Sequence, residues 1–112
     1  MKKNSSKTQI TIDQTETRSG LHLKMQGSFS GSEDAAIHFF EHLSKALEKK
    51  PKEIVLNMEE TMMIDSMAIG LLVGFLIKSR ERGILVRIEN INGTVKSILD
   101  TTGLNKAFPA LY

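Results

Sequence analysis

The stretch from Glu53 to Glu89 constrains the fold most, because it predicts a strand, a loop, a helix and a second strand in succession. A short run of aliphatic and β-branched residues, Ile54 to Met58, suits a buried strand. An apolar helical segment then runs to about Arg82, and Gly83 supplies a C-terminal stop. The second strand follows over residues 84–88. Two strands joined by a helix in this way are expected to be parallel, which places the chain in the α/β class.

Asp65 and Ser66 stand directly before the apolar helix. Both have a short side-chain oxygen that can accept a hydrogen bond from an otherwise unpaired amide at a helix N-terminus. A hydroxyl at this corner lies at the positive end of the helix dipole, where an anion is tolerated. Ser66 is therefore a candidate phosphorylation site. The plainer alternative is that Ser66 only caps the helix.

The helix itself is apolar on nearly all sides over its first three turns, and polar residues appear only from Lys78 onward. Such a helix is either fully buried or partly covered by a partner. A chain of 112 residues has little material with which to bury it, so we favour a partner surface. The apolar run Met67–Ile77 is too short to cross a bilayer. Gly70 and Gly74 predict a close backbone approach on one side of the helix.

The composition is ordinary for a single globular domain. The net charge of +2, from 15 Lys and Arg against 13 Asp and Glu, gives no reason to expect direct binding to nucleic acid. The absence of cysteine excludes disulfides and thiolate chemistry. The N-terminal sequence MKKNSSKTQ lacks the apolar segment of a signal peptide. We therefore expect a cytoplasmic protein without a membrane association, and the choice between a monomer and a weak dimer stays open.

The first part of the chain predicts a hairpin. Residues 1–8 are polar and are expected to form a flexible tail, so the domain is expected to cover residues 9–112. Two segments, Gln9–Asp13 and Leu21–Gln26, alternate apolar and polar residues, as a strand with one wet face does. The segment Gly27–Gly31, with the sequence GSFSG, is predicted to be a loop.

Two further helices are predicted on either side of the central unit. The first begins at Ser32, and its apolar stripe consists of Ala36, Phe40, Leu43 and Leu47. The second is short, is capped by Asn92 or Thr94 and ends at Gly103, after which residues 105–112 are predicted to be irregular.

These elements predict a single two-layer α/β domain with a mixed sheet of four or five strands and helices mainly on one face. The predicted core consists of the inward-facing apolar positions Leu21, Leu23, Met25, Phe40, Leu43, Val55, Ile69, Leu72, Val73, Leu76, Val86, Ile88, Ile98 and Leu99.

The sequence contains little evidence for a catalytic site. His38 and His42 match an HxxEH motif and could chelate zinc in a metal-dependent hydrolase, but an amphipathic helix needs this polar face in any case. Ser66 lacks a GxSxG elbow and a credible histidine base, which argues against a serine hydrolase. The chain has no phosphate-binding glycine-rich motif. We therefore expect no catalytic residues, no metal and no cofactor.

The segment LNMEETMMIDSMAIGLLVGFLIKSRERG, followed by TVKSILDTTGL, resembles the STAS domain of bacterial anti-sigma factor antagonists. The resemblance is good from about Glu53 to Leu104 and weaker from Gln9. It implies a non-enzymatic protein that binds an anti-sigma factor kinase and thereby releases a sigma factor. In that family the serine after the aspartate is phosphorylated by the kinase, which switches the antagonist off, and the matching position is Ser66. A STAS module of a transporter or of a stress-signalling assembly is the alternative within the same fold.

The sequence departs from this family at three places. Met67 and Ala68 stand where the family has Ser and Gly, and the loop Gly27–Ser30 lacks the acidic pair that meets the kinase. The family continues into a terminal helix, whereas this sequence stops at Tyr112, so the domain is expected to lack that helix or to expose the surface beneath it. The predicted partner surface comprises Ser28, Phe29, Ser30, Asp65, Ser66, Met67 and Gly70.

Overall fold

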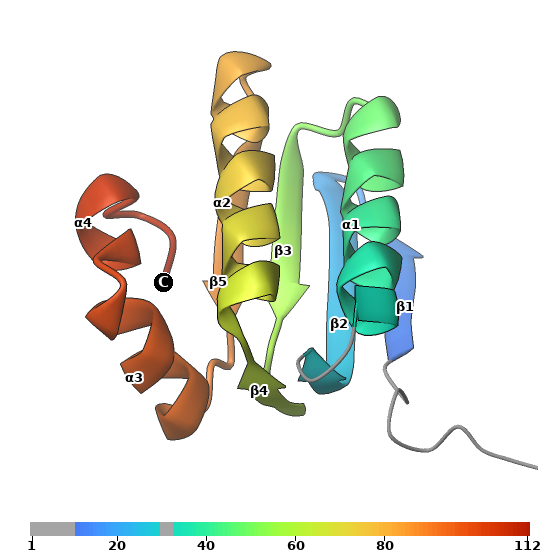
Figure 1. Ribbon diagram of the computed structural model, residues 1–112. Helices are drawn as coiled ribbons and strands as arrows, with labels where there is room; N and C mark the ends of the chain where they lie inside the picture. The colour runs from blue at the N-terminus through green and yellow to red at the C-terminus, as the bar shows by residue number, and fades with distance from the viewer. Residues whose placement is uncertain (1–10, 30–32) are drawn as a thin grey trace, which may run out of the picture.

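A mixed five-stranded sheet forms one layer of the domain (Figure 1). The computed structural model describes residues 11–29 and 33–112, with side chains in the first helix from residue 37 onward. The strands pair in the order β1-β2-β3-β5, and β4 pairs with the far end of β2. Only the β1–β2 pair is antiparallel. The strands are β1 (Thr11–Glu16), β2 (Gly20–Phe29), β3 (Glu53–Asn57), β4 (Thr61–Ile64) and β5 (Leu85–Glu89).

The helices form the second layer. Helices α1 (Glu33–Glu48) and α2 (Ser66–Glu81) lie side by side across one face of the sheet, as Figure 1 shows. Helices α3 (Gly93–Thr101) and α4 (Leu104–Ala107) follow β5 and lie beside α2. The predicted α/β class, the hairpin, the parallel strand–helix–strand unit and the two-layer arrangement are confirmed.

The core lies between the sheet and the two long helices. Alternate residues of β2, such as Leu21, Leu23 and Met25, are buried against the helices, and the equivalent positions of β3 and β5 join them. The opposite face of the sheet carries charged side chains around the buried Val55 and the half-exposed Leu85, and there the Arg87 guanidinium lies 2.9 Å from the Glu53 carboxylate. Most of the predicted core is buried, while Ile69, Val73 and Ile98 are partly buried and pack against it.

The predicted apolar stripe of α1 is confirmed at Leu43 and Leu47, which are buried, and is wrong at Phe40. Phe39 is 0% exposed and its ring packs edge-on against the Phe29 ring, whereas Phe40 is 45% exposed. Buried Phe39, Leu43 and Ala46 follow the helical spacing of four and three residues, and this sets the side of the helix that faces the sheet. Phe40 lies next to this face, where it lines a small cavity between α1 and α2. The Ala36 side chain lies outside the described residues.

The predicted loop Gly27–Gly31 is largely strand. Residues 27–29 extend β2 and pair in parallel with β4, across an irregularity between Gly27 and Ser28. Strand β4 was not predicted, because Thr61 and Ile64 are buried while the two methionines between them are exposed, and such a pattern matches neither helix nor strand spacing.

Both predicted glycine stops lie in the left-handed backbone region. At the end of α2, Gly83 has φ +71°, and the amides of Gly83 and Ile84 donate to the carbonyls of Arg80 and Ser79. At the end of α3, Gly103 has φ +80°, and the next residue, Leu104, is buried. The segment after Gly103, predicted to be irregular, includes the short helix α4.

The predicted close approach at Gly70 and Gly74 is wrong. A side-chain carbon placed at either glycine would meet no described atom within 4 Å, so no element in the described part of the chain approaches this side of α2 closely. Both glycines are exposed.

Candidate functional site

The corner between β4 and α2 is held by Asp65. Its carboxylate Oδ1 accepts a hydrogen bond from the Ala68 amide at 3.0 Å, and its own amide donates to the Phe29 carbonyl at 3.2 Å. The first bond caps the helix, and the second ties the corner to the end of β2. The helix therefore begins at a fixed point of the sheet.

Ser66 is the first residue of α2, and its side chain is exposed. The alternative that Ser66 caps the helix is wrong, because Asp65 occupies the capping position. At the first helical position the hydroxyl lies beside the unpaired amides of the helix N-terminus, where a negative charge is stabilised. The first turn of α2 contains no acidic residue, and the neighbouring Asp65 carboxylate is engaged as the cap through the Ala68 amide.

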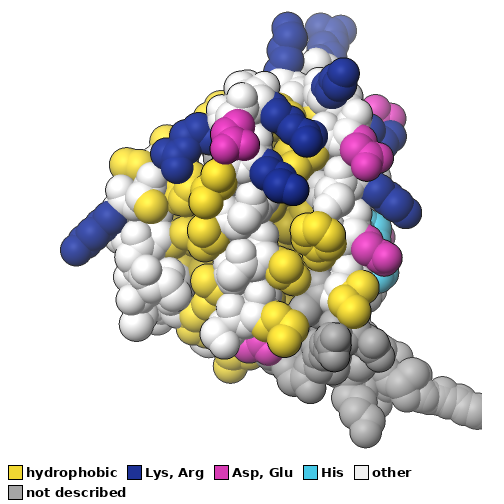
Figure 2. Space-filling view, turned by 45° about the horizontal axis from the view of Figure 1, so that its top comes forward, with side chains coloured by type: hydrophobic (Ala, Val, Ile, Leu, Met, Phe, Trp, Pro, Cys, Tyr) yellow, Lys and Arg dark blue, Asp and Glu magenta, His cyan; other side chains and the backbone are white. Residues whose placement is uncertain are grey.

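Three exposed methionines surround Ser66 in sequence. Met62 is 69% exposed, Met63 41% and Met67 53%, and we refer to these three exposed side chains as the methionine surface. Methionine is flexible and polarisable, which suits it to contact with an irregular partner surface. Figure 2 shows further hydrophobic side chains exposed over the helices. Only part of the apolar surface of α2 is therefore buried in the core.

The remaining predicted contact residues differ in their exposure to solvent. Met67 and Gly70 are exposed on α2, and Ser28 is half-buried at the end of β2. Phe29 is fully buried in the core, so its prediction as a contact residue is wrong. The aromatic ring points towards α1 because β2 continues to this position and keeps its alternation. Ser30 lies outside the described residues.

Two polar residues, Thr61 and Asn92, fix the corner through long-range hydrogen bonds that sequence reasoning missed. The buried Thr61 hydroxyl donates to the Met25 carbonyl at 2.9 Å, which joins β4 to β2. The Asn92 side-chain amide donates to the Thr61 carbonyl at 2.7 Å, while its oxygen accepts from the Val95 amide and caps α3. The cap was predicted, but the bond from Asn92 to β4 depends on a contact between distant segments and has no local signal.

The HxxEH motif does not assemble a metal centre within the described residues. The rings of His38 and His42 lie edge to face with their centroids 4.8 Å apart, and no group of three potential ligands occurs in this part of the chain. Burial lowers the pKa of His42, and the neighbouring His38 and Lys45 lower it further. His38 and His42 could therefore supply two zinc ligands, and the described residues provide no third ligand beside them.

The sheet order, the two long helices on one face and the Asp-Ser corner at the start of α2 define a small α/β domain with an exposed hydroxyl at a helix N-terminus. The model of the STAS domain family matches residues 12–112. The chain belongs to the STAS domain family. A comparison with curated protein sequences gave no significant match.

Solved structures of anti-sigma factor antagonists share this fold. The antagonist from Mycobacterium paratuberculosis is 19% identical, with a TM-score of 0.77 over 94% of this chain and 86% of that one. Unphosphorylated SpoIIAA is 19% identical, with a TM-score of 0.73 over 93% and 86% of the two chains. The phosphorylated form of SpoIIAA, described as a Bacillus cell fate determinant, is 18% identical, with a TM-score of 0.68 over 93% and 89%. Among the described residues, no helix of this chain is both long and apolar enough to span a membrane.

Proposed function

We propose that this protein is a non-enzymatic, cytoplasmic anti-sigma factor antagonist. It binds an anti-sigma factor that is also a serine kinase, and this binding releases a sigma factor. Phosphorylation of Ser66 by the same kinase ends the interaction. The observation that carries the proposal is the exposed Ser66 hydroxyl at the first position of α2, next to the methionine surface.

A phosphate on Ser66 would alter binding far more than folding. It would add nearly two negative charges at the positive end of the α2 dipole, where the helix tolerates them. A partner that covers Met67 and its neighbours would have to remove water from this dianion, which is costly. The similarity to both the unphosphorylated and the phosphorylated forms of SpoIIAA supports this view, because the two structures share the fold.

The contact surface that we propose consists of Ser28, Asp65, Ser66, Met67 and Gly70, extended by Met62 and Met63. The sequence lacks the acidic pair that the resemblance leads one to expect after β2. Exposed apolar area is therefore proposed to supply more of the binding free energy here than charge does.

The test uses Ser66→Asp and Ser66→Ala with the cognate anti-sigma factor. Ser66→Asp should weaken binding by at least about tenfold, which needs only about 1.4 kcal/mol. Ser66→Ala should bind like the wild type but should gain no phosphate when incubated with the kinase and ATP. Isothermal titration calorimetry measures the affinities, and mass spectrometry locates the phosphate.

Ser19→Asp is the matched control, because Ser19 is exposed in the β1–β2 turn at the opposite end of β2. It adds the same charge away from the proposed surface and should leave binding unchanged. Equal binding by wild type and Ser66→Asp, or phosphate on another residue such as Thr61 or Ser28, would place the switch elsewhere.

A further inference from the structure

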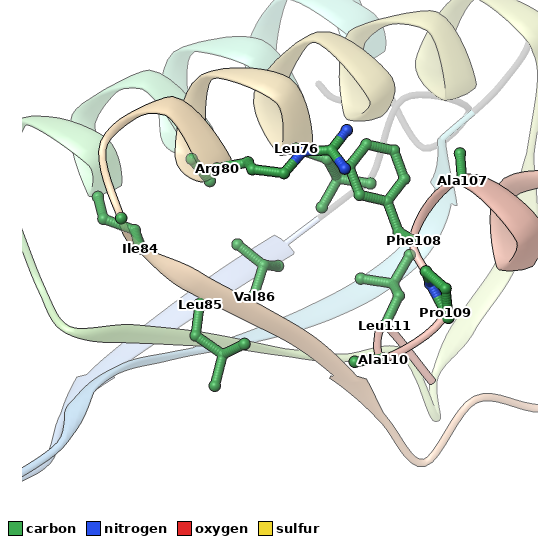
Figure 3. A pocket seen from close by; sticks show the side chains of 12 residues that line it. Leu76, Arg80, Ile84, Leu85, Val86, Ala107, Phe108, Pro109, Ala110 and Leu111 are labelled. Carbon is green, nitrogen blue, oxygen red and sulfur yellow. The ribbon is translucent and has the colours of Figure 1, made fainter.

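A second feature lies at the other end of α2. A cavity of about 390 Å³ opens between the last turns of α2, strand β5 and the segment after α4 (Figure 3). Its walls are mostly apolar, and in Figure 3 the Val86 side chain points into the space while Leu85 points away from it. Ligand pockets range from about 300 to 1,000 Å³, so this cavity is large enough for a small molecule.

One hydrogen bond and the burial of Leu111 fix the C-terminal wall of the cavity against β5. The Ile88 amide of β5 donates to the Leu111 carbonyl at 2.6 Å, and the Leu111 side chain is buried. The free edge of β5 is thereby joined to the C-terminal segment. Because both walls are fixed in this way, a ligand would bind without first ordering them.

One cation lies at the mouth of this apolar space. The Arg80 guanidinium is stacked over the Phe108 ring, 4.4 Å from its centroid, and it forms no ion pair with any described residue. The carbonyls of Ser79 and Arg80 already accept hydrogen bonds from the amides of Ile84 and Gly83. Because no described residue accepts a hydrogen bond from the Arg80 guanidinium, its N–H donors are available to an external anion. Figure 2 shows that Lys and Arg side chains gather at this end of the molecule, which favours the approach of an anion.

We propose that the cavity binds a medium-chain monocarboxylate. The hydrocarbon chain lies against Leu76, Val86 and Leu111, and the carboxylate pairs with the Arg80 guanidinium. A planar guanidinium matches both oxygens of a carboxylate, and its stacking on Phe108 holds it in position. The site lies 14 residues along α2 from Ser66, roughly 20 Å away, so it is separate from the proposed switch.

The test compares octanoate with octanol, which share the chain length and differ in charge. Titration into isotopically labelled protein should shift the methyl NMR signals of Leu76, Val86 and Leu111. Octanoate should bind at least about tenfold more tightly than octanol, the factor expected for one charge-assisted hydrogen bond. Both compounds are used below their self-association limits.

Arg80→Gln should reduce octanoate affinity to the octanol level and leave octanol affinity unchanged. Arg82→Gln is the matched control, because it removes the same charge from the same end of α2 at a position that does not line the cavity. It should change neither affinity. Equal affinities of wild type for the two compounds, or no shifts at the cavity methyls, would overturn the proposal. A parallel loss of octanol binding in Arg80→Gln would show that Arg80 supports the cavity walls and does not recognise the carboxylate.

Discussion

Asp65 and Ser66 have separate roles at the start of α2, although both residue types can cap a helix. The Asp65 carboxylate accepts a hydrogen bond from the Ala68 amide, while the side chain of the next residue, Ser66, is exposed. Helix stability and the proposed phosphorylation therefore depend on different side chains. A charge can be placed on Ser66 without removing the cap.

This division predicts unequal effects of two alanine substitutions. Asp65→Ala removes the cap and should lower the free energy of unfolding by about 1 kcal/mol. Ser66→Ala should change it by less than about 0.5 kcal/mol, as exposed substitutions usually do. Urea denaturation followed by circular dichroism measures both values.

Asp65→Asn is the control, because asparagine also caps helices well and should retain most of the stability. A larger loss for Ser66→Ala than for Asp65→Ala would mean that the serine is the structural residue at this corner.

At the scale of single elements, α1 shows how one residue determines which face is buried. Phe39 is fully buried and Phe40 is 45% exposed. Phe39→Ala should lower the free energy of unfolding by about 3 to 5 kcal/mol, because it leaves a cavity beside the Phe29 ring. Phe40→Ala removes the same atoms from a half-exposed site and should cost less than half as much. Chemical denaturation of the two variants compares them directly, and equal losses would contradict the observed face of α1.

The same helix shows where sequence reasoning reaches its limit. Phe39 and Phe40 each fit a helical stripe that includes Leu43 and Leu47, and packing against Phe29 of β2 determines which of the two is buried. The end of β2 was ambiguous in a similar way, because Gly27, Ser28 and Ser30 are residue types that favour turns and loops. Pairing with β4 overrides that preference, and this pairing joins segments more than thirty residues apart.

Elements with a strong local signal were predicted well. The β1–β2 hairpin, the two glycine stops and the Asn92 cap all depend on residues close together in sequence. The Asp65–Ser66 corner was located correctly for the same reason, while the assignment of the cap to one of the two residues required coordinates. The cavity beside Arg80 had no local signal, because it is formed by α2, β5 and the C-terminal segment together.

At the scale of the whole molecule, α2 connects two regions of different character. Its N-terminal end presents a hydroxyl and exposed methionines, and its C-terminal end borders an apolar cavity with a cation. Between the two ends, Leu72 is fully buried in the core. The two proposed sites can therefore be tested independently, since a substitution at either end leaves the buried middle unchanged.

The C-terminus is joined to the rest of the domain through Tyr112, the only tyrosine in the chain. Its hydroxyl donates a hydrogen bond to the Asp100 carboxylate of α3. Burial, followed by the bond and charge of Asp100, raises the pKa of Tyr112 from 10.0 to about 12. The bonds from Tyr112 and Lys96 lower the pKa of Asp100 in turn.

The raised tyrosine pKa gives a defined dependence of stability on pH. The folded protein holds the Tyr112 proton more tightly than the unfolded chain does, so this contribution to stability is complete below pH 10 and is lost as the pH rises from 10 to about 12. Tyrosinate absorbance should give a midpoint near 12 in the folded protein and near 10 in denaturant. Asp100→Asn should lower the folded midpoint, and Tyr112→Phe should make stability fall less steeply over this range. A folded midpoint near 10 would show that Tyr112 is not held against α3.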